Sequence, residues 1–181
     1  MYSLSVIIFG PLFSLAERQF NLNLAEAIRK KSQGFLRVIL PQEEGEKFKA
    51  KTGLDFEALY RHNLVNAEKH DLALAILDGA DVDSGTCIEI GYRKGKNRRK
   101  IVVGVRTDFR SCEDGKVNAM LRICNSIIEY YGSNIDELAG KIVAVFFQII
   151  EYGYCMEIER AVLPPPDKMK TLVRAFLGLA H

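Results

Sequence analysis

The chain has 181 residues, of which 48% are apolar and 27% are charged, and its formal net charge is +2. This length accommodates one domain with a full hydrophobic core, and the composition excludes a disordered chain. So small a net charge gives no reason to expect a nucleic-acid polymer as partner. The one dense basic run, residues 94–100, follows a predicted helix and is expected to form its solvated end.

Metal, disulfide and membrane functions find no support in the sequence. The four cysteines contain no Cys-x-x-Cys pair, and the two internal histidines stand at no ligand spacing from them. We therefore expect reduced thiols in a cytoplasmic protein, with no metal and no other cofactor. The apolar start of the chain is interrupted by Gly10-Pro11, which favours a buried strand over a signal peptide. The longest later apolar run, residues 142–150, is too short to span a membrane.

Apolar, β-rich runs alternate with helical patterns along the chain. Because these runs are continuously apolar, they are predicted to lie in a parallel sheet that is covered on both faces. The alternation predicts a doubly wound, five-stranded parallel α/β domain of the flavodoxin-like or Rossmann-like type, flanked by helices. The five predicted strands are Leu4–Phe9, Phe35–Leu40, Leu72–Leu77, Ile101–Val105 and Ile127–Tyr131.

Two of the predicted helices begin with a capping-box pattern, in which Ser or Thr is followed three residues later by Glu. Ser14 and Glu17 form the first, and Thr86 and Glu89 form the second. In the second pattern, Thr86 is the expected N-cap and Glu89 the third helical residue. A purely structural role for Glu89, as a helix cap, follows from this pattern alone.

Further helices complete the predicted domain. One is expected from about Leu54 to Lys69, one begins at Ser133, and a last one begins near Asp167 after three consecutive prolines. Residues 1–150 are predicted to form the α/β domain, and residues 151–181 a helical extension of that domain.

Three loops follow predicted strands and are expected to face one crevice: residues 9–11, 78–85 and 106–118. Ligands of doubly wound sheets bind at the carboxyl ends of the strands, near the point where strand order reverses. The second loop leads into the segment DGADVDSGTCIEIGY, which contains Asp83 and Glu89. A carboxylate in the first helical turn is held ionised by the helix dipole, as attack on an anomeric carbon requires. Asp83 is then placed to manage the proton of the leaving group.

Three segments in order resemble the nucleoside 2-deoxyribosyltransferase family: GPLFSLAERQFN, DSGTCIEIGY and TDFR…VNAML. The resemblance covers about residues 6–138. It implies a five-stranded parallel sheet and a double displacement. In that reaction Glu89 attacks C1′ of a 2′-deoxynucleoside, the base leaves, and a second base attacks the glycosyl-enzyme.

The resemblance also implies roles for other residues. Asp83 would assist departure and return of the base, and Asn118 would reach the site of a neighbouring subunit, which makes the protein a homodimer or a larger homo-oligomer. The alternative is a purely structural role, in which Asn118 caps the helix that begins at Ala119. The partners implied are a nucleoside or nucleotide and a free base, with no cofactor. The residues implied to bind the substrate are Phe9, Gly10, Phe13, Asn63, Asp78, Ser84, Gly85 and Met120.

Two departures from the family pattern leave the base selectivity open, and two alternative functions are weighed beside base exchange. Asn63 stands where many members of the family carry Asp. Arg93 follows the EIGY segment, at a position where the family often has a small residue. One alternative is a 2′-deoxynucleoside 5′-monophosphate N-glycosidase, since relatives with the same Glu hydrolyse such substrates. The other is a non-catalytic nucleotide-binding module. The apolar Pro-Leu-Phe stretch after Gly10 favours an unphosphorylated nucleoside over a 5′-monophosphate.

Overall fold

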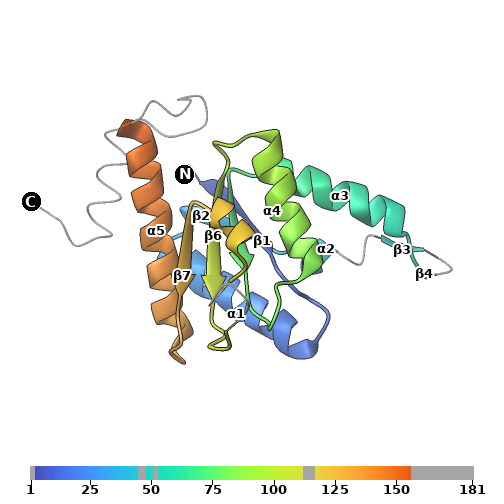
Figure 1. The fold of residues 1–181 in the computed structure, drawn as a ribbon, viewed down its shortest axis with the longest axis horizontal. Coiled ribbons are helices and arrows are strands. Elements are labelled where there is room, and N and C mark those ends of the chain that lie inside the picture. Colours follow the sequence, from blue (N-terminus) through green and yellow to red (C-terminus); the bar gives the residue numbers. More distant parts are fainter. Residues whose placement is uncertain (1–2, 45–47, 51–52, 112–116, 156–181) are drawn as a thin grey trace, which may run out of the picture.

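A five-stranded parallel sheet forms the centre of the protein (Figure 1). The computed structural model describes residues 3–44, 48–50, 53–111 and 117–155. The strand order is β2-β1-β5-β6-β7, which is the flavodoxin-like order, so the predicted doubly wound fold is confirmed. The strands are β1 (Leu4–Phe9), β2 (Leu36–Ile39), β5 (Leu72–Ile76), β6 (Ile101–Arg106) and β7 (Ser126–Glu129).

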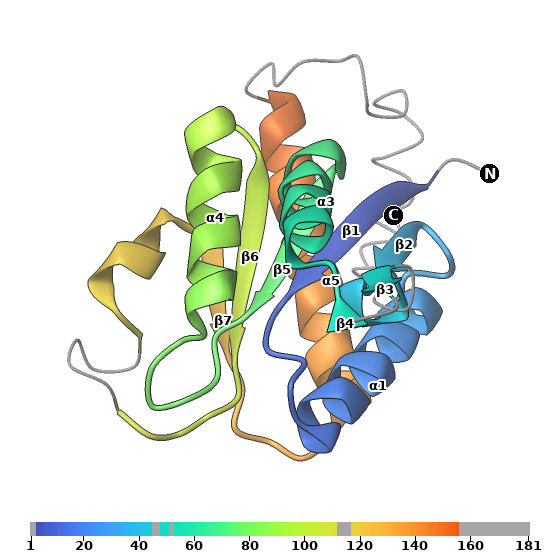
Figure 2. The same ribbon diagram turned by 90° about the vertical axis from the view of Figure 1, so that its right-hand side faces the viewer.

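Helices cover both faces of the sheet, as Figures 1 and 2 show. The α1 helix (Leu15–Lys31) packs against α5 (Ile135–Cys155) on one face, and α3 (Phe56–Lys69) packs against α4 (Ser84–Lys96) on the other. Every residue of β1 and β5 is buried, because both strands are covered on both sides. Alternate β1 side chains therefore enter two separate cores: Val6 and Ile8 join one, and Ile7 and Phe9 join the other.

The connections differ from the sequence-based expectation in detail. The polar stretch after β2 contains a short helix, α2 (Pro41–Glu44), and a two-stranded antiparallel ribbon, β3 (Lys49–Ala50) and β4 (Gly53–Leu54). A 3-10 helix, η2 (Ala119–Ile123), precedes β7.

The last described helix begins later than predicted. Asn134, not Ser133, supplies the side-chain oxygen that accepts from the first backbone N–H groups of α5, those of Asp136 and Glu137. The α5 helix continues through the predicted boundary at residue 150. The helix expected from Asp167 lies outside the described residues. None of the helices within the described ranges is long and apolar enough to cross a membrane.

The basic run at the end of α4, residues 94–100, is only partly exposed to solvent, contrary to expectation. Lys94 is 5% exposed and donates to the side-chain oxygen of Asn125 at 2.7 Å, whereas Lys96, Arg98 and Arg99 are exposed. The buried ammonium thereby joins the end of α4 to the start of β7.

Arg93 is fully buried although a small residue is common at this place in the family pattern. Its guanidinium donates four hydrogen bonds, all to backbone carbonyls near the end of α3 and the starts of β5 and β6. The acceptors are the carbonyls of Ala67, His70, Asp71 and Ile101. Arg93 therefore joins α4 to the end of the sheet opposite the candidate site, and we assign it a structural role.

Candidate functional site

A cleft of about 340 Å³ lies at the carboxyl ends of β1, β5 and β6. This volume falls at the lower end of the range for small-molecule sites. The cleft lies where strand order reverses, between β1 and β5, which is where a doubly wound sheet binds its ligands. Its lining residues are Pro11, Ala16, Glu17, Phe20, Asn21, Ile76, Asp78, Gly79, Asp108 and Arg110.

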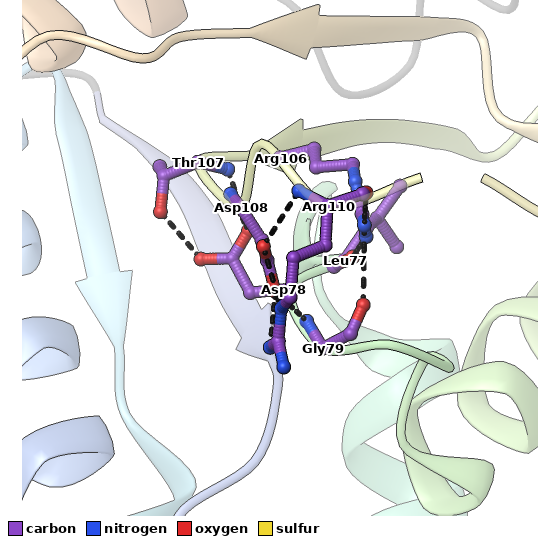
Figure 3. Close-up of polar contacts among 7 residues, drawn as sticks. All are labelled: Leu77, Asp78, Gly79, Arg106, Thr107, Asp108 and Arg110. Carbon is purple, nitrogen blue, oxygen red and sulfur yellow. Dashed lines mark hydrogen bonds and ion pairs between the residues drawn. The ribbon is translucent and has the colours of Figure 1, made fainter. Parts of the chain in front are cut away.

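Asp78 joins the loop after β5 to the loop after β6 (Figure 3). Its carboxylate accepts hydrogen bonds from the backbone N–H and the hydroxyl of Thr107, each at 2.5 Å, and from the backbone N–H of Asp108 at 3.0 Å. All three donors follow directly after β6. The carboxylate therefore fixes the direction in which the second loop leaves the sheet.

Arg106, the last residue of β6, makes the reverse connection. The side chain is 1% exposed, and its guanidinium donates to the carbonyls of Leu77 at 2.6 Å and Gly79 at 3.1 Å. It also donates to the carbonyl of Arg110 at 2.7 Å, within its own loop (Figure 3). Its Nε has no partner among the described residues. A single buried cation thus holds the backbone of both loops beneath the cleft.

Asp108 completes this set of contacts and holds the side chain of Arg110. It accepts from the backbone N–H of Gly79 at 3.1 Å and from the Nε and Nη2 groups of Arg110. These hydrogen bonds hold the pKa of Asp108 well below its usual range. Gly79 has a φ of +119°, a backbone conformation that residues other than glycine rarely adopt.

A third carboxylate, that of Glu17, enters the cleft from α1. The predicted capping box is confirmed: the hydroxyl of Ser14 accepts from the backbone N–H of Glu17, and Glu17 accepts from the backbone N–H of Ser14 at 2.7 Å. Hydrogen bonding, led by the backbone of Ser14, lowers the pKa of Glu17. With Asp78 and Asp108, the described lining of the cleft contains three carboxylates and one guanidinium.

The predicted capping box at α4 is wrong, because Asp83 and not Thr86 is the N-cap. The Oδ2 atom of Asp83 accepts from the backbone N–H of Thr86 at 2.8 Å and from its hydroxyl at 3.0 Å. Neither bond uses Oδ1. A β-carbon at Gly85 would lie 3.1 Å from Oδ2, so a glycine here leaves the carboxylate room.

Glu89 is consequently the sixth residue of α4, in its second turn, and not a cap. Within the described ranges, no hydrogen bond or ion pair to its carboxylate is found. Burial, and then the negative charge of Asp83, raises the pKa of Glu89 to about 8. Burial therefore opposes the ionised form of Glu89 that the helix dipole was expected to favour, and shifts the group towards its protonated form in the free protein.

The other sequence-predicted residues, Asp83 and Glu89 included, lie outside the lining of this cleft. Of the candidates, only Asp78 lines the cleft itself. Phe9 is 1% exposed and belongs to the core, so its side chain is not accessible to a ligand. Gly10 lets the end of β1 approach β5 closely, since a β-carbon there would lie 3.0 Å from the side chain of Ile76.

The remaining candidates are more exposed. Phe13 and Met120 are 74% and 80% exposed, and Ser84 and Gly85 are exposed in the first turn of α4. Asn63 is partly buried on α3.

Asn118 is exposed and is the N-cap of η2. Its side-chain oxygen accepts from the backbone N–H of Met120 at 2.9 Å, which agrees with the interpretation of Asn118 as a helix cap. The bond uses only Oδ1, so the amide N–H donors are not consumed by it.

Sequence reasoning missed most of the polar lining of the cleft. Asn21, Asp108 and Arg110 were not predicted, and Glu17 was predicted only as a helix cap. The signal for Asp108 and Arg110 was present in the segment TDFR, which directly follows a predicted strand. Nothing in the sequence indicated that Arg106, the first residue of the predicted loop, is buried and turns back under the neighbouring loop.

Known proteins resemble this chain in sequence and in fold. A solved structure of a conserved protein from Enterococcus faecalis V583 shares 24% identity with a TM-score of 0.62, covering 77% of this chain and 97% of its own. A 2-deoxyribosyltransferase from Bacillus psychrosaccharolyticus shares 16% identity with a TM-score of 0.54, covering 75% and 90%. Comparison with curated proteins gave no match. The sequence profile of the family described as nucleoside 2-deoxyribosyltransferase matches residues 8–163. Since this match spans most of the sequence, the chain belongs to the nucleoside 2-deoxyribosyltransferase family.

Proposed function

We propose that this protein exchanges the base of a 2′-deoxynucleoside through a covalent intermediate on Glu89. Family membership supplies the reaction class. The observation that carries the proposal for this chain is the state of Glu89, a desolvated carboxylate beside Asp83 that caps no helix and has no hydrogen bond within the described ranges. Buried carboxylates without a structural partner are costly, and they concentrate at functional sites.

The two carboxyl groups supply the charges that the reaction needs. In the first step, an oxygen of Glu89 bonds to C1′, the C1′–N bond breaks, and the base leaves with the bonding electrons and takes a proton from Asp83. In the second step, a nitrogen of the incoming base attacks C1′, its proton passes to Asp83, and the bond to Glu89 breaks.

One proton must therefore be shared by the two groups. At pH 7 the free protein holds this proton on Glu89, where the charge of Asp83 helps to retain it. When the 2′-deoxynucleoside binds, transfer of this proton from Glu89 to Asp83 yields an ionised nucleophile and a protonated acid. The Oδ1 atom of Asp83, which the helix cap leaves unused, is the position that we assign to this proton.

The charge of the cleft favours a nucleoside over its 5′-monophosphate. Three carboxylates and one guanidinium line it, and the guanidinium is already paired with Asp108. The carboxylates accept hydrogen bonds from sugar hydroxyls but repel a phosphate dianion. These features support transfer over the monophosphate hydrolase. The partly buried Glu89, which caps no helix, supports catalysis over a silent nucleotide-binding module.

The first test replaces the proposed nucleophile. Glu89→Gln retains the shape of the side chain and removes no helix cap, so the protein should fold normally and lose base exchange by at least about 1,000-fold, as expected for the loss of a covalent nucleophile. The measurement follows a deoxynucleoside and an acceptor base by chromatography. The matched control is Glu26→Gln, which changes an exposed Glu on α1. Exchange at a near-normal rate in Glu89→Gln would remove Glu89 from the mechanism.

The raised pKa of Glu89 makes stability depend on pH in a defined direction. The folded protein binds the proton of Glu89 up to about pH 8, whereas the unfolded chain releases it near pH 4.5. The contribution of this proton to the free energy of unfolding is therefore fully present below pH 4.5 and is lost as pH rises through 8. Between pH 5 and pH 8 the free energy of unfolding of the wild type should therefore fall relative to that of Glu89→Gln. A single group gives at most about 1.4 kcal/mol per pH unit.

This comparison is made by urea denaturation of both proteins across that range. Because all other ionisable groups are shared, their effects cancel in the difference. Parallel stability curves would show that Glu89 titrates as an exposed carboxyl.

A third test asks whether the site is shared between two subunits. If Asn118 serves the partner's site, Glu89→Gln and Asn118→Ala proteins, each inactive alone, should regain activity when refolded together. In a symmetric dimer each heterodimer contains about one intact site. Asn118→Asp keeps a capping oxygen for η2 but lacks the amide donors, and should be inactive alone if those donors orient the nucleophile. Failure to recover activity in the mixture would leave Asn118 with its capping role only.

A further inference from the structure

We infer that Asp108 is a specificity-determining residue that excludes phosphorylated substrates by keeping the guanidinium of Arg110 occupied. The inference rests on the proposed function and concerns the same site. Arg110 is the only cation that lines the cleft among the described residues, and it is therefore the group there most suited to bind a substrate phosphate.

The geometry shows how fully Asp108 engages this cation. Both Asp108 oxygens accept from Nε of Arg110, at 3.0 and 2.9 Å, and Oδ2 also accepts from Nη2. The backbone N–H of Arg110 donates to the same carboxylate at 3.0 Å. At the Nε and Nη2 edge of the guanidinium a phosphate would have to displace this carboxylate, and at the Nη1 end it would meet a cation whose charge Asp108 already neutralises.

Asp108 is well placed to hold its position in that competition. Its side chain is only 11% exposed, and the backbone N–H of Gly79 anchors it to the loop after β5, whereas the side chain of Arg110 is 59% exposed. The buried guanidinium of Arg106 fixes the same two loops. The carboxylate is thus the fixed partner, and Arg110 is oriented by it.

The surrounding charges strengthen the effect. Glu17 and Asp78 also line the cleft and offer only acceptors to a ligand when ionised. With Arg110 neutralised by Asp108, the cleft presents negative charge to an incoming ligand. An unphosphorylated 2′-deoxynucleoside has hydroxyl donors for these carboxylates, and a 5′-monophosphate adds a dianion that finds no unpaired cation among the described lining residues.

The test compares the affinities of one 2′-deoxynucleoside and its own 5′-monophosphate, measured by calorimetric titration without an acceptor base. In the wild type the nucleoside should bind more tightly. Asp108→Asn preserves an oxygen for the N–H of Gly79 but releases Arg110, so the ratio of monophosphate to nucleoside affinity should rise by about tenfold or more, which corresponds to about 1.4 kcal/mol. Asp108→Ser offers the same comparison if Asp108→Asn does not fold.

Two further variants separate release of the guanidinium from simple loss of negative charge. The double variant Asp108→Asn/Arg110→Gln removes the same carboxylate together with the cation, and the gain should disappear. Glu57→Gln removes the carboxylate of another Arg pair, that with Arg61 on α3, and should leave the ratio unchanged.

The possible failures are distinguishable. If the wild type binds neither ligand, both the proposed function and this inference fall. If the nucleoside binds but Asp108→Asn leaves the ratio unchanged, or the gain persists in the double variant, the inference is overturned and the proposed function stands. A wild type that prefers the monophosphate also overturns it.

Discussion

The candidate site depends on hydrogen bonds exchanged between the loops that follow β5 and β6. Arg106 donates from β6 to carbonyls of the first loop, and Asp78 accepts from N–H groups of the second. Because both residues act on backbone groups, they set the paths of the two chain segments and not merely the positions of side chains. The first segment leads to Asp83 and α4, and the second carries Asp108 and leads towards Asn118. The floor of the cleft and the approach to the proposed acid are therefore built by one set of contacts.

The start of α4 explains how Glu89 can lack hydrogen-bond partners among the described residues without leaving the helix end unsatisfied. Asp83 takes over the capping of α4, which satisfies the helix terminus and places its negative charge near Glu89. Burial and this charge together raise the pKa of Glu89, which favours its protonated form in the free protein. A retained proton is a cost to stability above the ordinary pKa of a carboxyl, and base exchange offers a reason to retain it, since the reaction needs one ionised and one protonated group.

The sequence predicted the sheet well because its central strands, β1, β5 and β6, are buried on both faces and are therefore almost continuously apolar. The first helix cap followed from a local pattern too, whereas the strand order depends on tertiary contacts that local patterns do not specify. The cap of α4 was predicted wrongly because Thr86-Glu89 and Asp83-Thr86 are both acceptable N-terminal patterns, and only tertiary structure decides between them. Arg106 could not be predicted as a loop anchor, because its partners are backbone carbonyls that sequence does not mark. The lining of the cleft was hard to predict because its residues also fit ordinary structural roles. Glu17 fits a helix cap, and Asp108 and Arg110 fit the polar residues that any exposed loop contains.

The central claim is that Glu89 forms a covalent bond to the sugar, and mass spectrometry tests it most directly. The protein is mixed with a 2′-deoxynucleoside in the absence of acceptor base, quenched in acid, digested and analysed. The account predicts a peptide whose mass is increased by one deoxyribosyl group, with the added group located on Glu89 and lost when acceptor base is supplied before quenching. A donor that is consumed while the peptide containing Glu89 stays unmodified, or a deoxyribosyl group found on Asp83 instead, would contradict the account.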